Sequence, residues 1–240
     1  MKFGSLFSGI GGFDLGLERA GMDCAWQVEI DPYATKVLEK HWPNVKRYKD
    51  VKECGKHNLE SVDLICGGFP CQDLSAAGKM AGLREGTKSG LWSEYSRIIG
   101  ELRPKYVLVE NVPGLLDNHA MGRVLGDLAE MRYDAEWDCL PACDFGAPFR
   151  RERIYILAVA DGKYGQERMG AQPNRSKTIF AGHHRLQFPF WLQAADQFIG
   201  MDDGVSGRLY QDRGRCLGNA VVPQIVEWIG RQIIKTTHTG

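Results

Sequence analysis

The chain has 240 residues, 43% of them hydrophobic, and its 30 basic and 30 acidic side chains leave no net charge. This content predicts one substantial hydrophobic core and excludes a second of similar size. Zero net charge argues against strong nonspecific attraction to nucleic acid, and no apolar run resembles a membrane span or a secretion signal. Seven cysteines without paired CxxC spacing argue against a disulfide framework and a structural zinc site, so a reduced, cytoplasmic setting is expected.

The N-terminal segment predicts a strand, a glycine turn and a helix. Lys2–Phe7 has the pattern of the strand, residues 8–12 (SGIGG) that of the turn, and Phe13–Ala20 that of the helix. Glycines let a ligand approach the backbone closely, although many glycine turns merely connect two elements. A second strand, Cys24–Val28, ends at Glu29, about twenty residues beyond the turn, where dinucleotide-binding folds place a ribose-binding acid. The two features together favour an adenosine-containing cofactor.

Two later strands each end at a side chain that could take part in catalysis. The apolar run 62–66 leads into Pro70 and Cys71, and the strand Tyr106–Val109 ends at Glu110. In open α/β sheets the carboxyl ends of parallel strands form the active-site edge. Taken singly, Cys71 fits a buried structural thiol and Glu110 a surface carboxylate. At one edge they fit a nucleophile and an acid or hydrogen-bond partner.

Strands alternate with helical stretches along the rest of the chain, which predicts an α/β fold with a mostly parallel sheet covered on both faces. The further elements expected are helices at 33–40, 91–102 and 121–131 and strands at 45–49 and 154–158.

Five motifs resemble those of the cytosine carbon-5 DNA methyltransferases, a family that uses S-adenosylmethionine, and they occur in that family's order. They are residues 7–12 (FSGIGG), 67–75 (GGFPCQDLS), 110–112 (ENV), 151–154 (RERI) and 218–223 (GNAVVP). The resemblance implies a Rossmann-like methyltransferase fold whose seven-stranded, mostly parallel sheet has one antiparallel strand. It also points to a compact member of phage or prophage type.

The motif positions divide the chain into three segments. Residues 1–160 are expected to form the catalytic and cofactor-binding domain, and residues 208–240 to carry the last motif and a helix, Gln224–Ile234, that returns to it. The loop-rich segment 161–207 stands where the family usually inserts a target-recognition domain. That domain is therefore expected to be reduced here.

The resemblance implies a covalent mechanism on a cytosine swung out of the DNA stack. The Cys71 thiolate would add to carbon 6, and the Glu110 carboxyl would protonate or hydrogen-bond the ring nitrogen. Carbon 5 would take the methyl group, lose its proton, and Cys71 would be expelled. Arg151 and Arg153 would hold the base oxygen and favour the thiolate by their charge.

Binding residues carry over by position as well. For S-adenosylmethionine they are Phe7, Gly9, Gly11 and Pro70, with Glu29 on the ribose, Ile30 against adenine, Asp50 on the adenine amine, and Asn219 completing the pocket. For DNA they are Gln72, Ser75, Arg84 and Arg97. From the residues alone, Asp50 equally fits a solvated loop carboxylate and Ile30 a core side chain.

The expected partner is double-stranded DNA, acted on by a bacterial or phage-encoded monomer, with restriction-modification as one setting and no metal ion. An accessory subunit for target recognition is a further expectation, since the recognition segment is short. Two alternatives stay open: the same chemistry on RNA, and a noncatalytic cofactor-binding or DNA-binding subunit. A nicotinamide dehydrogenase would share the glycine turn and Glu29 but gives no reason for the later motifs.

Overall fold

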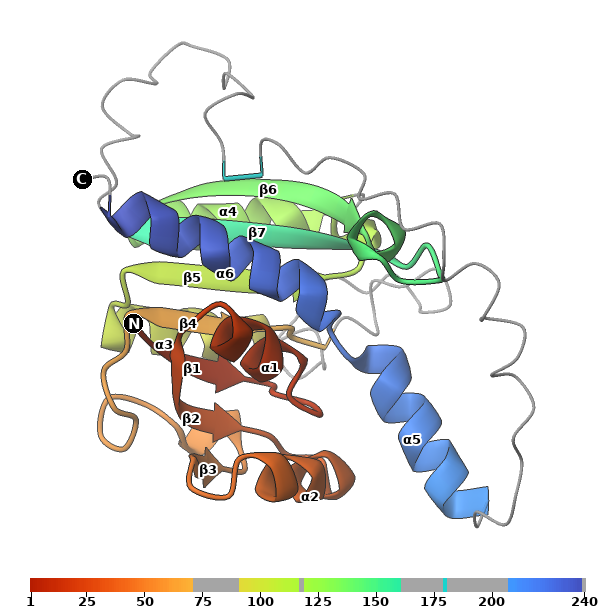
Figure 1. The fold of residues 1–240 in the computed structure, drawn as a ribbon. Coiled ribbons are helices and arrows are strands. Elements are labelled where there is room, and N and C mark those ends of the chain that lie inside the picture. Colours follow the sequence, from red (N-terminus) through yellow and green to blue (C-terminus); the bar gives the residue numbers. More distant parts are fainter. Residues whose placement is uncertain (71–90, 117–118, 161–178, 181–206, 239–240) are drawn as a thin grey trace.

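A computed structural model describes residues 1–70, 91–116, 119–160, 179–180 and 207–238. One seven-stranded sheet, in the order β3-β2-β1-β4-β5-β7-β6, runs through the described part (Figure 1). The strands are β1 (Lys2–Leu6), β2 (Asp23–Val28), β3 (Lys46–Tyr48), β4 (Leu64–Gly67), β5 (Tyr106–Asn111), β6 (Tyr133–Pro141) and β7 (Glu152–Ala160). Strand β7 pairs antiparallel with β5 and β6, and the other pairs are parallel. The expected sheet, including its single reversed strand, is confirmed.

Helices cover both faces of this sheet, as predicted. They are α1 (Gly12–Arg19), α2 (Pro32–His41), α3 (Leu91–Leu102), α4 (His119–Glu130), α5 (Gly207–Asn219) and α6 (Pro223–His238), with short 3-10 turns η1 (Val51–Glu53), η3 (Pro113–Leu115) and η4 (Ala142–Phe145). In Figure 1, α1 and α6 lie in front of the sheet and α3 and α4 behind it. Alternate residues of each strand pack against the helices on one side of the sheet or the other, because successive side chains of a strand point to opposite faces.

Each face has its own apolar cluster. Val107 and Val109 of β5 pack with Trp92, Tyr95 and other residues of α3 and α4, while Leu108 of the same strand packs with the α1 and α6 side. All six residues of β5 are buried, as expected of a central strand with helices on both faces. The strand end that carries Glu110 is therefore held from both sides.

Helix α6 packs closely against α1 because glycines remove side chains from the interface. A Cβ on Gly16 would lie 2.6 Å from both the Pro223 carbonyl oxygen and the Val226 Cβ, and one on Gly12 would lie 2.5 Å from the Val221 carbonyl oxygen. No real Cβ tolerates such distances, so both positions need glycine. This packing brings the C-terminal motif beside the N-terminal glycine turn.

Two elements were not predicted. Strand β6 was missed because its exposed and half-buried residues include three acids and carry little hydrophobic signal, as is common for a strand at the sheet edge. Helix α5 extends through Asn219, where the sequence predicted only the last motif; its mean hydropathy is low, so the period of its apolar residues was weak.

Most of the segment 161–207 lies outside the described residues. Its described part, Ile179 and Phe180, lies against the sheet: the Ile179 amide donates to Glu136 Oε1 at 2.8 Å, and Phe180 is buried in the α1/α6-side cluster.

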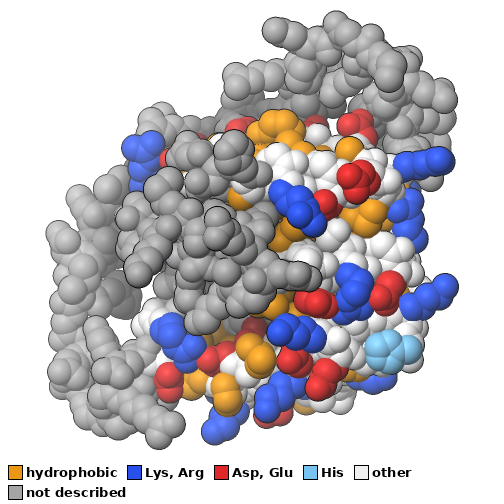
Figure 2. Space-filling view, turned by 180° about the vertical axis from the view of Figure 1, so that it is seen from behind, with side chains coloured by type: hydrophobic (Ala, Val, Ile, Leu, Met, Phe, Trp, Pro, Cys, Tyr) orange, Lys and Arg blue, Asp and Glu red, His pale blue; other side chains and the backbone are white. Residues whose placement is uncertain are grey.

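Charged side chains of both signs are interspersed on the face shown in Figure 2. Within the described residues no helix is long and apolar enough to cross a membrane. No group of three or more His, Cys, Asp or Glu side chains in that same part of the chain is arranged to hold a metal ion.

Candidate active site and cofactor pocket

Glu110, near the end of β5, is the most deeply buried of the predicted catalytic residues that the structure describes. It is 7% exposed, and its Oε1 lies 3.2 Å from Arg153 Nε on the neighbouring strand β7. Burial raises the pKa of Glu110 to about 7, against the opposing charges of Arg153 and Arg151. A pKa near neutrality suits a group that both donates and accepts a proton.

The backbone that leads toward Cys71 passes directly over this carboxyl. A Cβ on Gly68 would lie 2.8 Å from Glu110 Oε2, so a larger residue would displace the acid. Asn111 Nδ2 donates to the Phe69 carbonyl oxygen at 3.2 Å, and the Phe69 ring packs on Trp92 with centroids 5.4 Å apart. Asn111 was not predicted to have a role of its own, although the ENV motif contains it. The segment up to Pro70 is thus tied to β5 beside Glu110.

Cys71 itself follows Pro70 in the sequence and lies outside the described residues, as do Gln72, Ser75 and Arg84. Their predicted roles remain predictions.

Arg153 and Arg151 differ in what they contact. Arg153 Nη1 donates to the Glu152 carbonyl oxygen at 2.8 Å, while its Nη2 has no hydrogen-bond partner among the described residues. Arg151 donates from Nη1 to the Gly218 carbonyl oxygen at 2.6 Å and from Nη2 to that of Ala220 at 2.8 Å. These contacts join the residue before β7 to the last motif on either side of Asn219. The contact of Arg151 with a base oxygen stays a prediction.

The N-terminal glycine turn has a backbone shape that few residues tolerate. Gly9 and Gly11 have φ of 55° and 86°, and Phe7 has φ of 52°, a left-handed conformation that is uncommon for a non-glycine residue. The Phe7 ring packs near that of Tyr95, with centroids 6.2 Å apart. A side chain on Gly9 would find open space within 4 Å, so the turn leaves room above it. Backbone strain held in this way is typical of ligand-binding loops.

Glu29 connects the turn to the end of β2. Its Oε2 accepts from the Gly9 amide at 2.7 Å and its Oε1 from the Asp31 amide at 2.6 Å. Burial raises the pKa of this carboxyl. Each carboxylate oxygen has a second lone pair, so both amide bonds leave acceptor capacity for two ribose hydroxyls.

Ile30 and Asp50, the residues predicted to bind adenine, follow the neighbouring strands β2 and β3. Ile30 is 61% exposed, so its apolar side chain is accessible to a ligand. Asp50 follows β3, which pairs with β2, and its Oδ1 accepts from the Lys52 amide at 3.0 Å. Its Oδ2 has no partner among the described residues. The residues present therefore fit an adenosine moiety: acceptors for the hydroxyls and the amine, and an apolar side chain for the ring.

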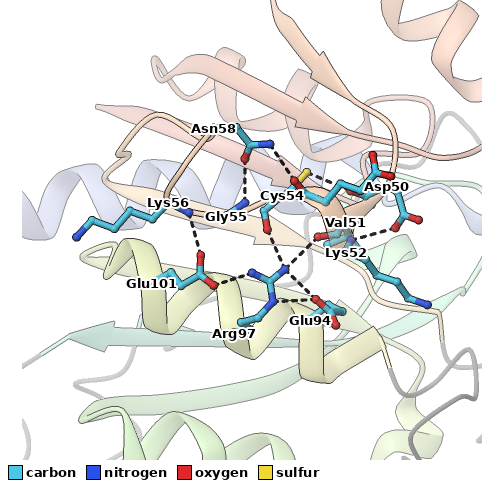
Figure 3. A network of polar contacts seen from close by, with 11 residues as sticks. Asp50, Val51, Lys52, Cys54, Gly55, Lys56, Asn58, Glu94, Arg97 and Glu101 are labelled. Atoms are coloured by element: carbon cyan, nitrogen blue, oxygen red, sulfur yellow. Dashed lines mark hydrogen bonds and ion pairs between the residues drawn. The ribbon is translucent and has the colours of Figure 1, made fainter.

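Arg97 was expected near DNA phosphates, and its contacts do not support that expectation. All three guanidinium nitrogens donate within the protein, to Glu94, Glu101 and two backbone carbonyls of the η1 region (Figure 3). For Arg97 to contact a phosphate, some of these hydrogen bonds would have to break.

A residue that the sequence reasoning missed is Asp31, which caps α2. Its Oδ1 accepts from the amides of Tyr33 and Ala34, and its Oδ2 pairs with Arg215 of α5 at 2.7 Å. The Asp31-Pro32 pair was the available signal, because aspartate at the N-cap followed by proline is a common helix start. The ion pair joins α5 to the start of α2, two residues beyond Glu29.

The sheet order with its one reversed strand, the glycine turn and the acid at the end of β2 together define a Rossmann-like, S-adenosylmethionine-dependent methyltransferase fold. Residues 1–182 match the family model of the C-5 cytosine-specific DNA methylases. The chain belongs to this family.

The similar proteins found by sequence are named type II methyltransferases, and they are longer than this chain. The chain is 41% identical to the type II methyltransferase M2.BsuMI of Bacillus subtilis over 66% of this chain and 42% of that protein. It is 35% identical to M.HhaI of Haemophilus parahaemolyticus, over 65% and 48% of the two chains. It thus spans less than half the length of these relatives.

Solved structures show the same architecture. A protein encoded within an E. coli prophage and described as a DNA modification methyltransferase matches with a TM-score of 0.57 and 29% identity, over 67% of this chain and 47% of that one. The S. pombe Dnmt2 methyltransferase matches with a TM-score of 0.56 at 21% identity, over 68% and 50%, which shows the fold alone.

Proposed function

We propose that this chain transfers a methyl group from S-adenosylmethionine to carbon 5 of a flipped-out cytosine in DNA, through a covalent bond between Cys71 and carbon 6. The observation that carries the proposal is the Glu110 carboxyl, buried beside Arg153 and the Gly68 backbone, with its pKa at about 7. It stands at the carboxyl edge of the sheet and lies against Gly68, which precedes Cys71 by three residues in the sequence.

The residues of the chain divide the chemistry between them. The Cys71 thiolate forms the S–C6 bond, and the displaced ring electrons are accommodated by a proton that Glu110 shares with the ring nitrogen. S-Adenosylmethionine supplies an electrophilic methyl group to carbon 5. S-Adenosylhomocysteine would remain, water would take the carbon-5 proton, and the electrons of that C–H bond would restore the ring double bond as the Cys71 thiolate is expelled. Glu110 would recover its proton from the ring nitrogen. Arg153 Nη2 is the donor available for the base oxygen.

The cofactor would be held by the residues that fit an adenosine moiety. Phe7, Gly9 and Gly11 form the turn, Glu29 takes the ribose hydroxyls, and Ile30 and Asp50 take the adenine. Pro70 and Asn219 would border the cofactor pocket, as their positions in the matched motifs imply. Arg151 then acts indirectly, by holding the segment that contains Asn219.

The proposal also covers the DNA substrate, the part of the protein that would recognise its sequence, and the biological role. The longer relatives are named type II methyltransferases, which supports duplex DNA as the substrate and DNA modification as the role. Sequence recognition would rest on the segment 161–207, which stands where the family usually inserts a target-recognition domain, on α5, or on an accessory subunit.

A covalent trap tests the proposal. The protein is incubated with S-adenosylmethionine and randomised duplex DNA containing 5-fluorocytosine, whose fluorine cannot leave as a cation, so Cys71 stays attached. We expect a denaturing gel to show an adduct that requires the cofactor, disappears in Cys71→Ser and persists in the control Cys143→Ser, a free thiol in η4.

Other outcomes would change the assignment. An adduct with RNA that contains 5-fluorocytosine, and none with DNA, would assign RNA as the substrate in place of DNA. An adduct that survives Cys71→Ser would refute the nucleophile. Cofactor binding without an adduct on either nucleic acid would favour the noncatalytic subunit.

A further inference from the structure

The Arg97 guanidinium connects α3 to the loop that carries Asp50. Its Nη2 donates to the Val51 carbonyl oxygen at 3.2 Å and to that of Cys54 at 2.8 Å, both in or beside η1. Its other nitrogens face its own helix, with Nε 2.9 Å from Glu94 Oε2 and Nη1 2.7 Å from Glu101 Oε1. Figure 3 shows the guanidinium between the helix and the loop.

The two glutamates hold the guanidinium in this orientation. They lie three residues before and four after Arg97, so all three side chains share one face of α3. Glu101 also reaches the loop directly, since its Oε2 accepts from the Lys56 amide at 2.9 Å. A Cβ on Gly55 would lie 2.4 Å from the same oxygen, so the loop approaches Glu101 as closely as only glycine allows.

The loop is also braced from within. Asn58 Oδ1 accepts from the Gly55 amide at 2.9 Å, and its Nδ2 donates to the Glu53 carbonyl oxygen at 2.9 Å. Asp50 begins η1 and caps it through the Lys52 amide. The position of the Asp50 carboxylate thus depends on η1, and η1 is anchored to α3 by Arg97.

We infer that Arg97 is a positioning residue for the adenine subsite: it fixes η1 against α3 and thereby sets the Asp50 carboxylate where it accepts from the adenine amine. The inference rests on the proposed use of S-adenosylmethionine. The Arg97 guanidinium can make this link because it is a charged planar fork with three donor nitrogens, whereas a single ammonium group cannot.

Arg97→Lys tests this role, because lysine keeps a positive charge between Glu94 and Glu101 but cannot also donate to both carbonyls. The measurement is the calorimetric affinity for S-adenosylhomocysteine and for S-inosylhomocysteine, which carries an oxygen in place of the adenine amine. The wild-type protein should prefer the adenosine ligand. In Arg97→Lys we expect its affinity to fall about tenfold, as for a lost hydrogen bond to a charged group, and the preference to shrink toward one.

Arg123→Lys is the matched control, since Arg123 of α4 pairs with Asp127 at the same i,i+4 spacing and, among the described residues, links to no second element. It should leave both affinities unchanged. If Arg97→Lys does not melt cooperatively, Glu101→Gln takes its place. That variant loses one ion pair of the set and should lower the preference in the same direction, by about threefold.

Three results would overturn the inference. Wild-type affinities in Arg97→Lys would show that Asp50 does not depend on it. An equal loss for both ligands, with the preference kept, would indicate general destabilisation. If the wild-type protein bound neither ligand, the proposed use of S-adenosylmethionine would itself be wrong. That result is seen in the wild-type protein alone, so it is distinguishable from the first two, which require the variant.

Discussion

Glu110 shows how burial sets the chemistry of one carboxyl group. Its neighbour Arg153 would lower the pKa if the pair were in water, but removal from solvent outweighs that charge and raises the pKa to about 7. The folded protein therefore holds a proton on this group at pH values where the unfolded chain, with an ordinary glutamate pKa of 4.5, has released it.

The raised pKa of Glu110 makes the free energy of unfolding depend on pH. Between pH 4.5 and about 7 folding takes up a proton at Glu110, so its contribution to the free energy of unfolding falls as pH rises. The loss amounts to roughly 3 kcal/mol once the pH exceeds the folded pKa. Glu110→Gln should lack this loss and should lower methyl transfer by about a hundredfold or more. Urea unfolding of both proteins at pH 5 and pH 8 measures the difference.

Glu130→Gln, an exposed carboxylate at the end of α4, is the control for that experiment. Glu29 and Asp14 also have raised pKa values because of burial, so the wild-type curve alone would not isolate Glu110. A Glu110→Gln protein with the same pH dependence as wild type would contradict the assigned pKa.

At the scale of elements, the close contact of α1 and α6 joins the two ends of the chain. Gly12 and Gly16 face the Val221 and Pro223 carbonyls, and the buried residues of α6, Ile225, Val226, Ile229 and Ile233, extend the core. The glycine turn that leads into α1 therefore depends on the C-terminal helix for its support.

Gly16→Ala should lower the free energy of unfolding by about 1–3 kcal/mol, because the added methyl group has no space against Pro223 and Val226. Its control is Gly122→Ala in α4, where a Cβ meets nothing within 4 Å. That change should raise stability by about 0.5–1 kcal/mol, since alanine favours the helix. Chemical denaturation compares the two. A stable Gly16→Ala would mean that α6 can shift away from α1 at little cost.

For the whole molecule, Arg151 links the start of β7 to the C-terminal segment. Its two hydrogen bonds go to the Gly218 carbonyl at the end of α5 and to the Ala220 carbonyl just beyond it, and its buried Nε has no partner among the described residues. Hydrogen bonds from a charged donor are among the stronger ones in a protein. The last motif is therefore held against the site by a residue assigned to a motif far earlier in the chain.

Arg151→Gln should release this segment. We expect amide hydrogen exchange at residues 218–221 to quicken about tenfold or more, since roughly 1.5–3 kcal/mol of charge-assisted hydrogen bonding is lost. Affinity for S-adenosylhomocysteine should fall as Asn219 is freed. Arg150→Gln, whose side chain is 82% exposed, is the control. Unchanged exchange in Arg151→Gln would place the restraint elsewhere.

The sequence by itself determined the class of fold and the edge at which the site forms. Apolar runs and glycine turns are local, so Tyr106–Val109 leading to Glu110, the turn at residues 8–12, and the helix 91–102 were predicted close to their observed positions. Strand β6 and helix α5 were missed because their polar side chains, at an edge or beside solvent, leave a weak hydrophobic period.

Only the tertiary structure decided what the charged side chains do. Arginine has the same chemistry in every motif, and the partners of Arg97, Arg151 and Arg153 come from segments up to 69 residues away. Burial likewise arises only when the strands and helices pack, so the raised pKa of Glu110 has no local signal. Motifs specify which groups are present, and packing decides whether each of them meets the substrate, the cofactor or the protein's own backbone.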